Sequence, residues 1–210
     1  MNLNQFKHNY LNHYLLLEKD FIETMQYVTV EKSNFETYSA VFLKLLLAVG
    51  SEIDIMLDFV SKLYDPSNSE TGFGCSKVIW KFEKDITKLE IELIGKDITL
   101  APWKSDEKYS THIPIWWTVY NEIKHNRYGI AEKFDKTKRY YQYANLINIL
   151  NSLAALYSLE LYAYKFIANV ENERIFVPTC KTIFTINNSH WKDISFGNGI
   201  VYYKEGIYLE

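Results

Sequence analysis

The chain has 210 residues, 48% of them hydrophobic, which is enough for one domain with a buried core. The formal net charge of −3 excludes a strongly basic protein, but it does not exclude a local basic patch. Two cysteines and the lack of a signal-peptide pattern argue against a disulfide-stapled secreted domain. No apolar run is long enough to span a membrane, so we expect a cytoplasmic protein that does not contact the membrane.

Helical periodicity dominates the first third of the chain. Apolar residues at helical spacing predict a first helix over residues 4–27 and a second over residues 38–64. The second helix is followed by Asp65-Pro66-Ser67-Asn68, a typical turn sequence. A loop to residue 75 and a short helix over residues 76–85 are expected next.

The middle of the chain is predicted to contain a β-hairpin between helices. Residues 88–94 alternate between polar and apolar, and Gly95-Lys96-Asp97 separates them from a second apolar stretch at residues 98–100. After a loop, Pro114 suits the first turn of a helix that extends to about residue 128. The charged segment 130–141 is predicted to be a loop.

The last third predicts a long helix and a second hairpin. The helix spans residues 143–168, and the hairpin spans residues 193–203 around a Gly197-Asn198 turn. The predicted fold is therefore mainly α, a helical bundle with two small β-hairpin decorations. We expect residues 1–170 to form the bundle, with a hairpin insertion near residues 88–100, and residues 171–210 to form a β-rich tail packed on it.

Two carboxylates occupy apolar helix faces. At 100° per residue, Glu52 shares its face only with apolar neighbours, and Glu160 lies on the apolar side of the last long helix. A buried carboxylate needs a partner or must hold a proton. Either each acid binds a tyrosine or a helix end, or both meet the cations of the 114–128 helix.

The 114–128 helix carries most of the polar chemistry of the chain. Trp116, Trp117 and Tyr120 suit docking against the bundle, and Asn121, Lys124 and His125 can share one face. His125 is suited to acid–base work, Lys124 or Arg127 could hold a phosphate, and Asn121 could orient the imidazole or a ligand. A structural alternative has His125 and Lys124 neutralising Glu52 or Glu160, beside Tyr120.

A second group of cations follows in the charged segment. Lys138 and Arg139 stand beside Tyr140, Tyr141 and Tyr143, a combination that can bind nucleic acid. A solvated charged loop is the alternative.

A metal centre is not expected. Glu122 and His125 have the Glu-x-x-His spacing of carboxylate-bridged metal bundles, but such sites use two of these elements and this chain has one. No cysteine-rich zinc spacing and no phosphate-binding loop are present, so we expect no cofactor.

The layout resembles prokaryotic HEPN-like helical proteins. The resemblance covers residues 21–166 and is carried by Tyr38-Ser39, Ser51-Glu52-Ile53-Asp54, Trp116-Trp117, Tyr120-Asn121, Lys124-His125-Asn126-Arg127 and the apolar helix of residues 144–164. It implies a dimerising helical bundle, in many members a metal-independent ribonuclease of a toxin–antitoxin, phage-defence or CRISPR-linked system. The usual motif places an arginine before a histidine, whereas His125 precedes Arg127 here.

Two functions are therefore expected from the sequence. The first is RNA binding or RNA cleavage by a homodimer, with His125, Lys124, Arg127 and Asn121 at the catalytic site, supported by Glu52, Glu160 and Tyr120. The second is a non-enzymatic interaction or dimerisation module with a protein partner, in which a buried centre of glutamate with histidine or lysine is structural.

Overall fold

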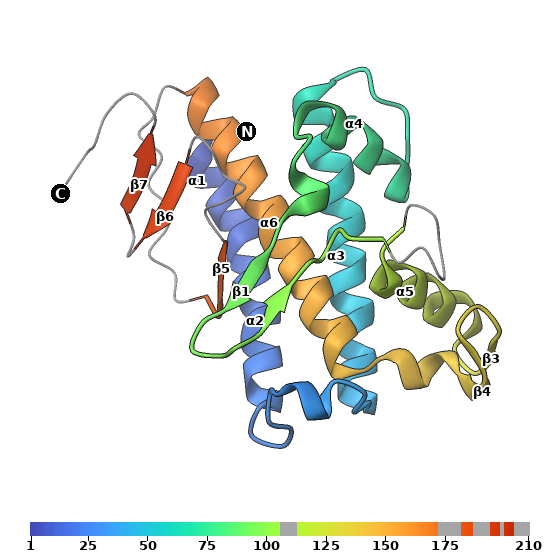
Figure 1. The fold of residues 1–210 in the computed structure, drawn as a ribbon. Coiled ribbons are helices and arrows are strands. Elements are labelled where there is room, and N and C mark those ends of the chain that lie inside the picture. Colours follow the sequence, from blue (N-terminus) through green and yellow to red (C-terminus); the bar gives the residue numbers. More distant parts are fainter. Residues whose placement is uncertain (106–112, 172–181, 187–193, 198–199, 204–210) are drawn as a thin grey trace.

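The computed structural model describes residues 1–105, 113–171, 182–186, 194–197 and 200–203 (Figure 1). The helices are α1 (Leu3–Phe6), α2 (Asn12–Thr24), α3 (Ala40–Tyr64), α4 (Cys75–Phe82), α5 (Ile115–Asn126) and α6 (Leu146–Val170). The strands are β1 (Ile91–Leu93), β2 (Thr99–Leu100), β3 (Ile130–Ala131), β4 (Asp135–Arg139), β5 (Phe184–Ile186), β6 (Ile194–Gly197) and β7 (Ile200–Tyr203). The prediction of a mainly α fold with small β decorations is confirmed.

The centre of the bundle is α6. It lies between the α1–α2 helix and α3, and α5 packs against both α3 and α6 near one end (Figure 1). The prediction that no apolar run is long enough to span a membrane is wrong by length and composition, since the segment Leu146–Ala168 is long and apolar enough; however, 89% of an 18-residue stretch within it is buried inside the fold. Such burial is typical of the core helix of a soluble protein, because an all-round apolar helix is stable only where every face is covered.

The first predicted helix is continuous but not uniform. Asn2 caps it, since the Gln5 backbone N–H donates to the Asn2 carbonyl side-chain oxygen at 2.8 Å. Between α1 and α2, residues Lys7–Leu11 form a π-helical turn. A π turn contains an extra residue, so it changes the direction in which the following side chains point relative to a regular α-helix. Tyr10 lies in this turn.

The second predicted helix has the expected ends. Ser39 caps α3 by accepting a hydrogen bond from the Phe42 N–H at 3.0 Å, and the helix stops at Tyr64, just before the Asp65-Pro66 turn. The loop to residue 75 and the short helix α4 are also found where they were predicted.

Both predicted hairpins are present. Strands β1 and β2 pair antiparallel, with Ile91 opposite Leu100, and Gly95 adopts φ +75° in the turn between them. Strands β6 and β7 also pair antiparallel, with a turn that lies outside the described residues. A contact between distant segments was not predicted: β5 adds to β1, with Ile91 opposite Ile186.

The prediction of a loop over residues 130–141 is wrong. Strands β3 and β4 form a third hairpin there, with Ile130 opposite Arg139 and an irregular register near Ala131. The strand β4 has no apolar alternation, so the period-2 signal is absent from the sequence. Phe134, at the turn, packs against Tyr140 and Tyr143 with ring centroids 6.3 Å and 4.7 Å away, and this packing holds the hairpin to the bundle.

Candidate functional site

The aromatic side chains of α5 dock the helix into the bundle. Trp116 and Trp117 are buried, and the Trp116 indole N–H donates to the Pro102 carbonyl at 2.6 Å. Tyr120 is also buried and lies against Gly50 of α3 so closely that a Cβ on Gly50 would be 2.3 Å from the ring. These residues fix which face of α5 points outward, and that face carries the predicted polar side chains.

Lys124 and Tyr120 meet an acid of α3, but not the predicted one. The Tyr120 hydroxyl donates to Asp54 Oδ2 at 2.9 Å, and the Lys124 ammonium lies 3.8 Å from the same oxygen. Lys124 also lies 5.4 Å from the centroid of the Tyr120 ring, within cation–π range. Burial and the hydrogen bond to Asp54 raise the pKa of Tyr120, so this phenol stays protonated. Asp54 was not among the residues predicted from the sequence, because helical projection places it beside exposed residues.

His125 and Arg127 are exposed at the end of α5. Within residues 1–105 and 113–171, neither side chain forms a hydrogen bond or an ion pair. The helix ends at Asn126, and Arg127 is its C-cap with helical dihedrals of φ −45° and ψ −45°. Asn121 does not reach His125, since its amide donates to the Trp117 carbonyl of its own helix at 2.9 Å. Of the four predicted catalytic side chains, His125 and Arg127 are thus the two that are unengaged.

Glu52 and Glu160 point inward as expected, but the prediction that they contact the cations of α5 is wrong. Glu52 lies 3.5 Å from the imidazole of His13 on α2, an ion pair when the imidazole is protonated. Burial raises the pKa of Glu52, and His13 opposes this shift. The reason is geometric: α2 lies along the face of α3 that carries Glu52, whereas α5 packs near Asp54 and Gly50.

Glu160 is a buried acid whose carboxyl group has no hydrogen-bond partner among the described residues. Only 1% of it is exposed. Burial, followed by the neighbouring Glu52, raises the pKa of Glu160 well above its ordinary value. Burial, followed by the charges of Glu52, Glu160 and Asp58, also raises the pKa of Tyr10 in the π turn.

A third buried acid was not singled out from the sequence. Glu18 of α2 is 1% exposed and its Oε1 accepts three hydrogen bonds: Tyr14 and Thr182 donate their hydroxyl hydrogens, the latter at 2.6 Å, and the Ile183 N–H donates at 3.2 Å. Burial still raises the pKa of Glu18, but these hydrogen bonds oppose the shift. Its position among apolar residues of the first helix was the available signal.

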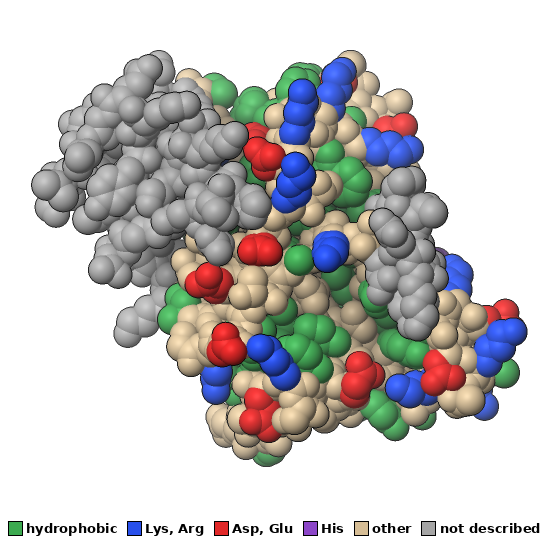
Figure 2. Space-filling view, viewed as in Figure 1, with side chains coloured by type: hydrophobic (Ala, Val, Ile, Leu, Met, Phe, Trp, Pro, Cys, Tyr) green, Lys and Arg blue, Asp and Glu red, His purple; other side chains and the backbone are tan. Residues whose placement is uncertain are grey.

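The second predicted cation group lies beside the end of α5. Lys138 is 3.7 Å from Glu36 and 5.7 Å from the centroid of the Tyr143 ring, and Arg139 Nη1 donates to the Tyr128 carbonyl at 2.5 Å. In Figure 2, Lys and Arg side chains gather at the lower right, where Figure 1 places α5, β3 and β4, with acidic side chains between them. We call residues 121–143, together with Tyr38 that packs against Tyr141, the α5-end surface.

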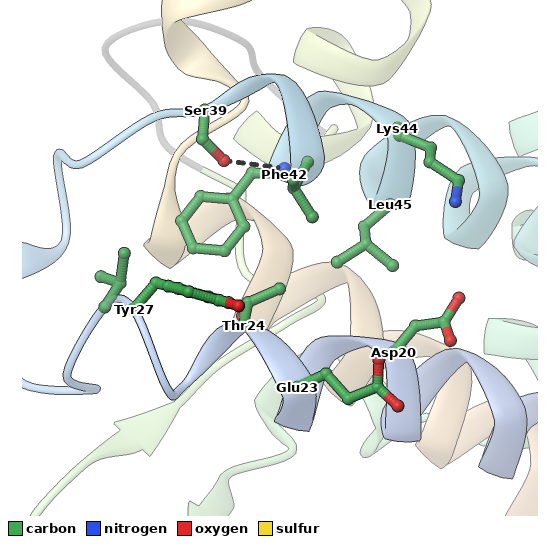
Figure 3. Close-up of a pocket in the computed structure, with 10 residues that line it drawn as sticks. Asp20, Glu23, Thr24, Tyr27, Ser39, Phe42, Lys44 and Leu45 are labelled. Atoms are coloured by element: carbon green, nitrogen blue, oxygen red, sulfur yellow. Dashed lines mark hydrogen bonds between the residues drawn. The ribbon is translucent and has the colours of Figure 1, made fainter.

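A pocket of about 350 Å³ lies elsewhere, between the end of α2 and the start of α3 (Figure 3). The side chains of Phe42 and Leu45 line it, and the charged groups at its edge are Asp20, Glu23 and Lys44. It can hold a small apolar group. None of the residues that line it was predicted to be functional, and it contains no acid–base set centred on a histidine.

Substitutions of His13 and His125 distinguish a histidine that pairs with a buried acid, Glu52, from an exposed histidine without such a contact. Replacing His13 with alanine removes the partner of Glu52 and is expected to lower stability by about 0.5 kcal/mol, a small loss because the imidazole is half exposed. Replacing His125 with alanine is expected to leave stability unchanged. Urea denaturation of both variants measures this difference, and a larger loss in His125→Ala would mean that His125 has a structural contact.

The fold and this surface define a mainly α protein with a cationic, aromatic end and a buried carboxylate centre. No family model, no curated protein and no solved structure matches the chain. Inference about its function therefore depends on the contacts and charges of its own side chains.

Proposed function

We propose that this protein binds RNA through the α5-end surface, as a HEPN-like cytoplasmic protein that acts as a homodimer. One observation carries the proposal. Residues 121–143 contain six Lys and Arg against three Asp and Glu, although the whole chain has 23 against 26. A local excess of cations in an acidic protein is the electrostatic signature of a surface for phosphates.

Several of these cations are available to a ligand. Lys124, Lys133 and Lys138 are paired with acids, and Arg139 donates to the Tyr128 carbonyl. Arg127 and Lys136 are the two remaining cations of the segment, both exposed and without either kind of contact within the described part of the chain. Phosphate contacts from free cations cost no existing ion pair. Arg127 and Lys136 are therefore expected to contribute more to RNA affinity than Lys138, which would have to leave Glu36.

Charge reversal tests the proposal. The variant Arg127→Glu/Lys136→Glu is expected to weaken the binding of a labelled RNA 20-mer by at least tenfold, because two phosphate contacts become repulsive. The slope of log K against the logarithm of the salt concentration is expected to become shallower by roughly two, one for each lost phosphate contact. Fluorescence anisotropy between 50 and 300 mM KCl measures both quantities.

The matched control places the same charge change at Lys77 of α4 and at Lys84, just after the end of this helix. Lys77 and Lys84 are exposed and lie at another end of the bundle, so Lys77→Glu/Lys84→Glu is expected to bind RNA almost like the wild type. Equal losses in the two double variants would show that only net charge matters, and the α5-end surface would lose its role.

RNA cleavage is a second candidate function, favoured by the unengaged imidazole of His125. As a base, His125 would take the proton of a ribose 2′-hydroxyl as this oxygen attacks phosphorus, and His125 of a second copy would protonate the leaving 5′-oxygen. Arg127 would stabilise the charge that develops on the phosphate oxygens. The scheme needs two α5 ends to face each other, as the expected homodimer would allow.

Comparison of wild type with His125→Ala decides between binding and cleavage. If the protein is a nuclease, His125→Ala is expected to reduce cleavage at least a hundredfold, within the range of a general acid–base group, while RNA affinity stays within a factor of three. Equal cleavage by both proteins would remove His125 from catalysis, whereas no cleavage by either protein would favour the non-enzymatic interaction module.

A further inference from the structure

Three tyrosines form an exposed group on the α5-end surface. Tyr38 is 45% exposed and Tyr128 is 69% exposed. The partly buried Tyr141 lies between them, with its ring centroid 5.8 Å from each of the other two. We refer to Tyr38, Tyr128 and Tyr141 as the tyrosine cluster.

Hydrogen bonds to the backbone and to one hydroxyl fix the position of the tyrosine cluster. The Tyr141 N–H donates to the Arg127 carbonyl at 3.1 Å, and Arg139 holds the Tyr128 carbonyl. The Gln142 amide donates to the Tyr38 hydroxyl at 3.3 Å. The rings come from three separate segments, namely the residue before the cap of α3, the end of α5 and the short helix after β4. Such links keep the rings in place without covering them.

The arrangement of the rings leaves surface for a ligand. The planes of Tyr38 and Tyr141 are at 72°, and those of Tyr128 and Tyr141 are at 60°, so neither pair stacks face to face. Exposed tyrosines next to cations favour flat, negatively charged ligands, because bases can stack on the rings while neighbouring cations, here Arg127 and Arg139, can contact the phosphates. Duplex RNA does not offer its base faces, since they are stacked on one another.

We propose that the tyrosine cluster stacks unpaired bases, and that the ligand of the α5-end surface is therefore single-stranded RNA, not duplex RNA. This inference rests on the proposed RNA-binding function and specifies its substrate class. It assigns Tyr128 and Tyr38 as the stacking residues, with Tyr128 the larger contributor because more of it is exposed.

The experiment compares a labelled single-stranded RNA 12-mer with a hairpin duplex of similar length by fluorescence anisotropy. The wild type is expected to bind the single strand at least tenfold more tightly. Tyr128→Ala is expected to weaken single-strand binding by roughly 5- to 100-fold, the usual effect of losing one stacking residue, without changing the salt dependence. Tyr128→Phe keeps the ring and is expected to bind like the wild type.

The folded state should tolerate these changes, because the Tyr128 side chain is mostly exposed and its carbonyl stays available to Arg139. Phe82→Ala, at an exposed aromatic residue of α4, is the control and should leave affinity unchanged. Equal affinity for both RNAs, with no effect of Tyr128→Ala, overturns the stacking role, and charge reversal at Arg127 and Lys136 would still weaken binding. Binding of neither RNA overturns the proposed function itself.

Discussion

Replacing Glu160 with leucine is expected to stabilise this protein, by an amount that grows as the pH rises. Both carboxyl oxygens of Glu160 are buried without a partner among the described residues, and its neighbours on α6 are apolar. A buried polar group without a hydrogen bond costs about 1–3 kcal/mol, and leucine removes that cost while filling a similar volume. A gain of about this size is therefore expected even where the acid is protonated in both states.

The pH dependence follows from the raised pKa. Below an unfolded-state pKa of about 4.3, Glu160 is protonated whether the chain is folded or not, and it contributes no pH dependence. Above that pH the unfolded chain releases the proton while the folded protein retains it. The free energy of unfolding then falls by up to about 1.4 kcal/mol per pH unit, until the pH reaches the raised pKa of the folded state.

Urea denaturation between pH 4 and pH 8 measures both effects. The difference between Glu160→Leu and wild type is expected to increase across this range, and Glu160→Gln should lose the pH dependence while keeping the cost of a buried amide. A constant difference, or a loss of stability in Glu160→Leu, would show that the folded protein ionises or pairs this acid.

Glu18 provides a matched control with the opposite sign. It is as deeply buried as Glu160, but its Oε1 accepts hydrogen bonds from Tyr14, Thr182 and the Ile183 N–H. Glu18→Leu would remove the acceptor from the buried Tyr14 hydroxyl and from the partly buried Thr182 and Ile183 donors, and a loss of about 3 kcal/mol is expected. Identical substitutions at two buried glutamates thus test whether hydrogen bonding, not burial alone, decides the sign.

Helix ends and inward-facing acids could be predicted from the sequence because both depend on local geometry. Ser39, Pro66 and Pro114 limit helices through their own backbone and side-chain chemistry, so no knowledge of the fold is needed. Glu52 and Glu160 were placed on buried faces because 100° per residue fixes which residues share a face.

Partners across the bundle could not be predicted in this way. Periodicity shows which residues share a helix face, but not which other helix packs against that face. The sequence therefore could not show that Glu52 pairs with His13 and not with a cation of α5. Glu18 and Thr182 are 164 residues apart, and the paired strands β1 and β5 are also far apart in the sequence. The β3–β4 hairpin was missed because its pairing is between backbones, with Phe134 as its main apolar anchor.

The position of the α5-end surface depends on a single glycine of α3, and Gly50→Ala is expected to lower stability by about 1–3 kcal/mol. In an exposed helix this substitution would instead be stabilising by about 0.5–1 kcal/mol. Here the new Cβ would be 2.3 Å from Tyr120 Cδ2. Tyr120 cannot simply turn away, because its hydroxyl donates to Asp54 and its ring lies 5.3 Å from that of Trp117.

A double-mutant cycle isolates this contact. In the Tyr120→Ala background the space beside Gly50 is open, so adding Gly50→Ala is expected to cost nothing or to stabilise slightly through helix propensity. Ser51→Ala, at the exposed neighbouring position of α3, controls for the effect of alanine on the helix itself. If Gly50→Ala costs the same with and without Tyr120, the close approach of α5 to α3 does not limit this position. A cost that disappears with Tyr120 would identify Gly50 as the residue that lets α5 dock and present His125 and Arg127 to solvent.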